Sequence, residues 1–214
     1  HEEPQARRLC RAFASRLVEA TTAERARFRT CAVVGSSGEL SNSGYGAAID
    51  ACDAVFRCND APTGEYSADV GNRTTFRLGS HVVWGKYLAA HPSFDARGRD
   101  VDGTTPVVYC FNPWLGNCQT QVLTREPEKN IRGRPIYMIN PVLIRRLYAV
   151  LQSFGDRSKR PLTGSTAVAM AMSMCDRVAL YGFANDSDPT SSTAGKCSHY
   201  YKCKSNLTAY FGGP

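Results

Sequence analysis

The sequence predicts one α/β domain with a Rossmann-like fold, in which helices cover both faces of a mostly parallel sheet. Short apolar, β-prone segments alternate along the chain with segments of helical length, and this alternation is typical of parallel strands joined by crossover helices. The 214 residues, 43% of them hydrophobic, are enough for one sizeable domain but not for two. In such a sheet we expect ligands at the carboxyl ends of the strands.

The first half of the chain is expected to contribute a leading helix, several strands and one connecting helix. Apolar residues at helical spacing predict an amphipathic helix over residues 5–29, packed against the core. The strands predicted in this half are Cys31–Gly35, Ala54–Asn59, Thr74–Leu78 and Pro106–Phe111. Ser43–Asp53 is predicted to form a helix, and the polar, glycine-containing segment Asp95–Thr105 a surface loop.

The second half repeats the alternation. Ile136–Ile139 is apolar and β-prone, and Pro141 is a suitable first-turn residue for a helix that continues through Val142–Ser153. Gly164–Cys175 is rich in alanine and methionine with almost no charge, which predicts a helix buried on most sides. Arg177–Phe183 is the last predicted strand.

The charge balance favours an anionic small ligand. The chain has 26 basic and 19 acidic side chains, a formal net charge of +7. This charge is compatible with nucleic acid, but the arginines are scattered and no basic run with interleaved aromatic residues is present. We therefore expect no nucleic-acid partner.

The cysteines and glycosylation sequons favour an oxidising lumen. None of the nine cysteines forms a Cys-x-x-Cys pair, so disulfides are favoured over a zinc site, and the odd count leaves at least one thiol free or paired outside the chain. Asn-x-Ser/Thr sequons stand at Asn72, Asn185 and Asn206. Without a signal peptide or an apolar segment of about 18 residues, we expect either a soluble protein or one whose N-terminal anchor has been removed.

A first motif surrounds the turn Gly35-Ser-Ser-Gly38, which follows a buried strand. Many α/β folds use such a turn without any ligand, so the turn alone is weak evidence. The order of residues from Cys31 through Asn59 to Thr75, however, resembles the large sialylmotif of the eukaryotic sialyltransferases. The resemblance implies a variant GT-A type of Rossmann-like domain and a cytidine nucleotide held by Ser36, Ser37 and Asn59.

A second motif, Pro161-Leu-Thr-Gly-Ser-Thr166, continues through a predicted helix and strand and resembles the small sialylmotif. In that family the turn at the helix N-terminus binds the donor phosphate, which implies this role for Thr163, Gly164 and Ser165. The free N–H groups and the dipole of a helix N-terminus favour an anion on physical grounds as well. The alternative is that Thr163 or Ser165 only caps the helix. Leu162 stands where the family usually has serine.

A third motif, His199-Tyr200-Tyr201, resembles motif III of the same family. A lone histidine is more often structural, but its place after the small motif matches the family. The resemblance implies that His199 is catalytic, contacting the donor phosphate and stabilising it as it leaves, and that Tyr200 belongs to the donor site. Lys202 replaces an acidic residue common in the family.

The resemblance also implies a disulfide between Cys31 and Cys175, which we expect to hold the nucleotide loop beside the phosphate loop. Closing a loop of roughly 145 residues contributes on the order of 5 kcal/mol to stability in the chain-entropy model. The remaining connectivity stays open. Local pairs to consider are Cys110 with Cys118 and Cys197 with Cys203.

One family motif has no counterpart in these residues. The general base of the sialyltransferases lies in a His-x-x-x-x-Glu segment, and His199 is the last histidine of this chain. The explanations, in order of preference, are a missing C-terminal segment, His199 acting as the base, and a protein that binds donor without transferring it. We accordingly treat residues 1–30 as a lead-in helix and 31–214 as a catalytic domain apparently without that segment.

The function implied is inverting, metal-independent transfer of sialic acid from CMP-sialic acid to a glycan acceptor in the Golgi lumen, by a protein of type II membrane topology. No cofactor is expected beyond the donor substrate. The triplets Asp100-Val-Asp102 and Asp186-Ser-Asp188 resemble metal-binding pairs, but we interpret them as solvated loops because the sialyl donor carries one phosphate. The alternatives are a non-catalytic CMP- or glycan-binding module and a transferase for another CMP-activated acidic sugar.

Overall fold

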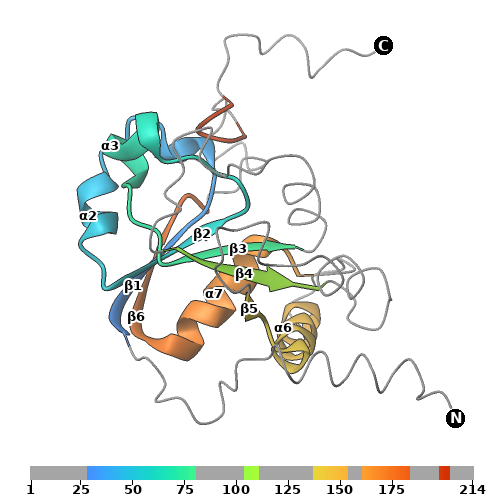
Figure 1. Cartoon of the computed structure of the whole chain (residues 1–214). Helices are drawn as coiled ribbons and strands as arrows, with labels where there is room; N and C mark the ends of the chain where they lie inside the picture. The colour runs from blue at the N-terminus through green and yellow to red at the C-terminus, as the bar shows by residue number, and fades with distance from the viewer. Residues whose placement is uncertain (1–27, 81–103, 111–136, 154–160, 184–197, 203–214) are drawn as a thin grey trace, which may run out of the picture.

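Six parallel strands form one sheet in the computed structural model, which describes residues 28–80, 104–110, 137–153, 161–183 and 198–202 (Figure 1). The strands lie in the order β5-β4-β3-β2-β1-β6. In chain order they are β1 (Phe28–Val34), β2 (Ala54–Cys58), β3 (Phe76–Ser80), β4 (Thr105–Tyr109), β5 (Tyr137–Met138) and β6 (Cys175–Tyr181). This parallel sheet confirms the predicted α/β, Rossmann-like fold class.

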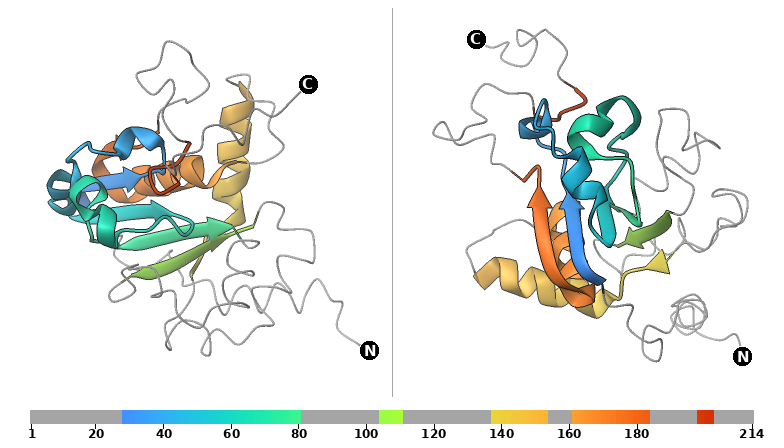
Figure 2. Two further views of the ribbon diagram at one scale, coloured as in Figure 1. Left: turned by 90° about the horizontal axis from the view of Figure 1, so that it is seen from above. Right: turned by 90° about the vertical axis from the view of Figure 1, so that its left-hand side faces the viewer.

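Helices cover both faces of the sheet, as predicted (Figure 2). One face carries α6 (Pro141–Ser153) and α7 (Thr163–Met174), and the other carries the short helices η1 (Gly38–Leu40), α2 (Gly46–Asp50), η2 (Gly64–Tyr66) and α3 (Ser67–Val70). Alternate residues of β1 face opposite layers: Val33 packs in the cluster with Ala167 of α7, and Val34 packs in the cluster with Ile49 of α2.

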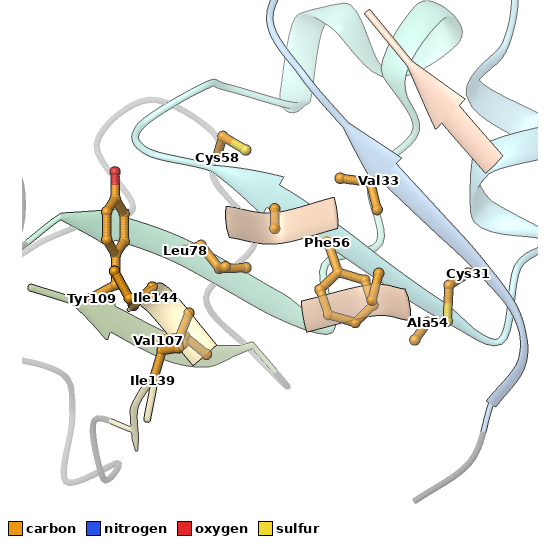
Figure 3. Packing of buried hydrophobic residues seen from close by; sticks show 12 residues of the cluster. Cys31, Val33, Ala54, Phe56, Cys58, Leu78, Val107, Tyr109, Ile139 and Ile144 are labelled. Atoms are coloured by element: carbon orange, nitrogen blue, oxygen red, sulfur yellow. The ribbon is translucent and has the colours of Figure 1, made fainter. Parts of the chain in front are cut away.

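The layer beneath α7 holds the larger apolar cluster. Figure 3 shows side chains of neighbouring strands, among them Val33, Phe56, Leu78 and Val107, gathered on this face of the sheet. The rings of Phe56 and Phe76 stack with their centroids 4.9 Å apart.

Helix α7 is fully buried only at Thr166, Ala167 and Ala171, so the prediction of a helix buried on most sides is wrong. Ala167 and Ala171 are fully buried against the sheet, whereas Met172 is 70% exposed. The small alanine side chains let the helix backbone approach the strands closely, while Val168, Met170 and Met174 are half-buried and pack against the edge of the same cluster.

Several predicted boundaries are corrected. Strand β1 begins at Phe28, so the last residues of the predicted helix 5–29 are extended, and the rest of that helix lies outside the described residues. Helix α2 starts only at Gly46, because Asn42 and Gly44 adopt φ angles of 59° and 68° and form a turn. The predicted loop Asp95–Thr105 falls mostly outside the described residues, and Thr105 already belongs to β4.

A disulfide joins Cys31 to Cys175, with their Cα atoms 6.1 Å apart, which confirms the predicted pair. Its place differs from the expectation, however. Cys175 is the first residue of β6 and Cys31 pairs in register with the first residue of β2, so the bridge lies toward the amino-terminal ends of the strands. The nucleotide and phosphate loops, which follow the carboxyl end of β1 and precede α7, are at the other edge.

The remaining described cysteines are in different states. Cys110 is also disulfide-bonded, and its predicted partner Cys118 lies outside the described residues, as do Cys197 and Cys203. Cys52 and Cys58 are free thiols. Among the described helices, none has the length and hydropathy needed to cross a membrane.

Candidate functional site

The strand order creates a switch point between β1 and β6. The chain builds β2 to β5 on one side of β1 and then places β6 on its other side, and in doubly wound sheets ligands bind at the carboxyl edge of such a point. The turn Gly35–Gly38 follows β1 there, and Gly182 follows β6. The amide of Gly35 donates to the carbonyl of Tyr181 at 2.7 Å. A Cβ on Gly35 would lie 2.2 Å from the Gly182 carbonyl oxygen, so only glycine allows this approach.

The two serines of this turn are placed differently. Ser37 is buried, its amide donates to the Gly182 carbonyl at 3.2 Å, and its hydroxyl accepts from the Glu39 amide at 3.3 Å as the N-cap of η1. Ser36 is half-buried, and its carbonyl accepts from the Tyr200 amide at 3.1 Å. Ser37 therefore holds the turn in shape, while Ser36 is the more accessible of the two predicted donor contacts.

Asn59 follows β2 and meets the second motif. Its backbone adopts a φ of 52°, a left-handed conformation that asparagine tolerates better than most residues. Its side-chain Oδ1 accepts a hydrogen bond from the Thr163 hydroxyl at 3.3 Å, although 104 residues separate them. The predicted nucleotide-binding asparagine and the predicted phosphate-binding turn are thus in direct contact.

A buried arginine supports the backbone around Asn59. Arg77 is 1% exposed, and its Nη1 donates to the carbonyls of Asn59 and Ala61, each at 3.0 Å. Arg57 pairs with Arg77 in register on the adjacent strand and is equally buried. Its guanidinium donates to the carbonyls of Val70 and Arg73 and to the Thr74 hydroxyl. Such bonds partly offset the cost of burying a guanidinium and fix both ends of the connection between β2 and β3.

The N-terminus of α7 carries no side-chain cap. The N-cap residue is Leu162, so the alternative that Thr163 or Ser165 caps the helix is wrong. The Ser165 hydroxyl instead donates to the Leu162 carbonyl at 2.9 Å, and Thr163 bonds to Asn59 and Tyr109. The helix end therefore presents amide N–H groups and the positive end of the dipole without a competing side-chain acceptor.

Gly164 lies in the first turn of α7, against the end of β6. A Cβ added to it would come within 2.9 Å of the Phe183 ring. A larger residue at this position would therefore push aside the partly exposed Phe183 ring, which packs beside the predicted phosphate site.

Motif III is attached to the first motif through Tyr200. In addition to its amide bond to Ser36, the Tyr200 hydroxyl donates to the Pro62 carbonyl, and the side chain is only 4% exposed. Burial raises the pKa of Tyr200 well above its usual range. Tyr200 thus fixes motif III next to the Gly35–Gly38 turn, and the adjacent His199, half-buried, packs edge-to-face on Tyr201 with ring centroids 5.3 Å apart.

Tyr109 and Arg77 are the site residues that sequence reasoning missed. The Tyr109 hydroxyl lies 2.9 Å from the Thr163 hydroxyl. A signal for Tyr109 was available, since it lies near the carboxyl end of the predicted strand Pro106–Phe111, on the edge where ligands bind in parallel sheets. For Arg77 the only signal was a charged residue inside an apolar strand.

Comparison with known proteins identifies the family. The family model described as glycosyltransferase family 29 (sialyltransferase) matches residues 3–94 and 108–211. The chain belongs to this sialyltransferase family. The resemblance of its motifs to the sialylmotifs is thereby confirmed.

Individual sialyltransferases are also similar to this chain in sequence. Beta-galactoside alpha-2,6-sialyltransferase 2 of Danio rerio is 31% identical over 193 residues, which are 85% of this chain and 37% of the relative. CMP-N-acetylneuraminate-beta-galactosamide-alpha-2,3-sialyltransferase 1 of Mus musculus is 32% identical over 190 residues, 85% of this chain and 51% of the relative. The chain thus spans about a third to a half of these curated sialyltransferases.

A solved sialyltransferase structure shares the fold. The crystal structure of a mammalian sialyltransferase in complex with Gal-beta-1-3GalNAc-ortho-nitrophenol aligns with a TM-score of 0.60 and 27% identity, covering 81% of this chain and 60% of that one.

No group of three metal-ligating side chains occurs within the described parts of this sialyltransferase-family chain. Both Asp-x-Asp triplets lie outside those parts.

Proposed function

We propose that the protein is a sialyltransferase that binds CMP-sialic acid and transfers sialic acid to a hydroxyl of a glycan acceptor. The observation that carries the proposal is the meeting of the two sialylmotifs through Asn59 and Thr163 at the carboxyl edge of the sheet. Membership of the family and the resemblance of the motifs support the donor; the names of the relatives support a galactose-containing acceptor.

In the proposed donor site, different segments bind the cytidine and the phosphate of the donor. Ser36 and Asn59, at the ends of β1 and β2, hold the cytidine part of the donor, with Ser37 shaping the turn. The amides of Thr163, Gly164 and Ser165 bind the phosphate, because an uncapped helix N-terminus favours an anion.

The proposed reaction is a single inverting displacement. The acceptor oxygen attacks the anomeric carbon of sialic acid and the bond to the phosphate oxygen breaks, so that CMP leaves with the electron pair, through an oxocarbenium-like transition state. Negative charge grows on the departing phosphate, where His199 and the α7 N-terminus stabilise it electrostatically. With a single phosphate to stabilise, we propose that no divalent cation is needed. The proton of the acceptor hydroxyl passes to a base for which no described residue has a family match.

The proposal is tested by CMP release from CMP-sialic acid with a galactose-terminated acceptor, using the full-length gene product. Acceptor-dependent release that His199→Ala reduces at least tenfold is expected. Binding of CMP without any release supports a non-catalytic binding module instead, and faster release from another CMP-activated acidic sugar would reassign the donor. We also propose the Golgi lumen as the location, which immunofluorescence against a Golgi marker tests.

A further inference from the structure

We propose that Tyr109 is a positioning residue of the donor site, which sets the direction in which the Asn59 amide presents its N–H groups to the nucleotide. This inference rests on the proposed function. Tyr109 ends β4, Asn59 follows β2, and Thr163 begins α7, so three separate elements contribute to one row of hydrogen-bonding groups.

The chemistry of the three side chains fixes the direction of the row. The Asn59 Oδ1 atom can only accept, so the Thr163 hydroxyl, 3.3 Å away, gives it its single proton. The Thr163 oxygen is then an acceptor toward Tyr109, and the Tyr109 hydroxyl, 2.9 Å away, is the donor. The row therefore runs from Tyr109 to Thr163 to Asn59.

The consequence appears at the far end of the row. With Oδ1 engaged, the Nδ2 group of Asn59 is left as a donor of two hydrogen bonds, and it has no partner among the described residues. Rotation of the amide by 180° would place Nδ2 against Thr163, whose oxygen already accepts from Tyr109 and whose proton would lose Oδ1 as its acceptor. The row thus favours ligand atoms that accept hydrogen bonds, such as nucleotide oxygens or ring nitrogens.

The buried position of Tyr109 stabilises this direction of the hydrogen bonds. The residue is 1% exposed, and Figure 3 shows its ring in the apolar layer with the hydroxyl directed away from Ile139. A buried phenol ring held by packing has little freedom to turn its hydroxyl elsewhere. Removing that hydroxyl leaves the Thr163 oxygen unrestrained and free to accept from Nδ2 instead of donating to Oδ1, so the Asn59 amide is less firmly oriented.

Tyr109→Phe in the full-length protein tests the proposal, because it removes the hydroxyl and keeps the ring. We expect the Kd for CMP, measured by isothermal titration calorimetry, to rise about 3- to 10-fold, the range of one net hydrogen bond. The KM for CMP-sialic acid should rise with it while kcat changes less than twofold. Tyr137→Phe on the neighbouring strand β5 is the matched control and is expected to leave both values unchanged.

A double-mutant cycle separates positioning from a merely structural role. If Tyr109 acts through Thr163, adding Tyr109→Phe to Thr163→Val should weaken CMP binding no further. Additive losses, or a Tyr109→Phe Kd within twofold of wild type, would overturn the proposal. Should Tyr109→Phe fail to fold, Thr163→Ser, which keeps the hydroxyl, must bind CMP better than Thr163→Val, and equal affinities would overturn it. A wild-type protein that does not bind CMP refutes the proposed function instead.

Discussion

Removal of the Cys31–Cys175 disulfide is expected to destabilise the fold strongly while leaving the donor site intact. The two cysteines are 144 residues apart in sequence. For a loop of that length the chain-entropy model gives a loss of about 5 kcal/mol in the free energy of unfolding. This is the upper end of the range, because residual structure in the unfolded chain already restricts the loop.

The site should survive because the bridge is at the other end of the structure. Cys175 follows the last residue of α7, whereas the phosphate-binding turn begins that helix. The 12 residues of the helix separate the two ends by about 18 Å at 1.5 Å per residue. Loss of the disulfide therefore lowers the free energy of unfolding, whereas the Kd of the folded protein for CMP should change little.

The assay compares a Cys31→Ala/Cys175→Ala variant with wild type by calorimetric melting and by CMP titration at a temperature where both are folded. A loss of about 5 kcal/mol corresponds to a Tm lower by roughly 10–20 °C for a domain of this size. Cys52→Ala is the control, because Cys52 is a free, half-buried thiol, and its Tm should move by less than about 3 °C. A double variant that melts within about 3 °C of wild type, or that is fully folded and fails to bind CMP, would refute this reasoning.

The remaining predictions concern the turn, the nucleotide contact and the buried thiol. Gly35→Ala should abolish measurable CMP binding in calorimetry, because its Cβ would lie 2.2 Å from the Gly182 carbonyl oxygen and force the turn apart. Asn59→Gly, which accepts the φ of 52°, should raise the Kd for CMP about 3- to 10-fold, and an unchanged Kd would remove Asn59 from the site. Burial raises the pKa of Cys58 to about 12, so mass spectrometry after iodoacetamide treatment at pH 8 should find Cys52 modified well before Cys58. Because the folded pKa lies above the usual thiol value of 9.0, the contribution of Cys58 to stability is present below pH 9 and lost between about pH 9 and 12. Urea titrations in that window should therefore show a smaller pH dependence for Cys58→Ala.

The fold class could be predicted from the sequence because a strand that is covered on both faces of the sheet needs apolar residues at consecutive positions. Val33 and Val34 point to opposite layers and are both buried, so the second half of β1, Cys31–Val34, appears in the sequence as an uninterrupted apolar run, as central parallel strands do. The ends of elements were less accurate. Helix α2 starts late because Asn42 and Gly44 form a left-handed turn, which amino-acid preferences only weakly indicate.

Only those site residues that belong to a recognisable motif could be predicted from the sequence. Asn59 and Thr163 were found through the resemblance to the sialylmotifs, but their contact depends on how β2 and α7 pack, which local sequence does not encode. Arg77 is an example of a site residue that no motif indicated. Its guanidinium binds the carbonyls of Asn59 and Ala61, and no side-chain pattern reveals a bond to backbone oxygen.

The strand order explains why the donor motifs are far apart in sequence and yet form one site. The chain fills one side of β1 with β2, β3, β4 and β5 before it crosses to the other side, so the strand that completes the switch point, β6, comes last. The loop after β1 and the helix before β6 must therefore come from distant parts of the chain. One of the intervening strands also reaches the site, because the Tyr109 hydroxyl at the end of β4 lies 2.9 Å from the Thr163 hydroxyl. The candidate site is thus assembled from the ends of β1, β2 and β4 and from the N-terminus of α7.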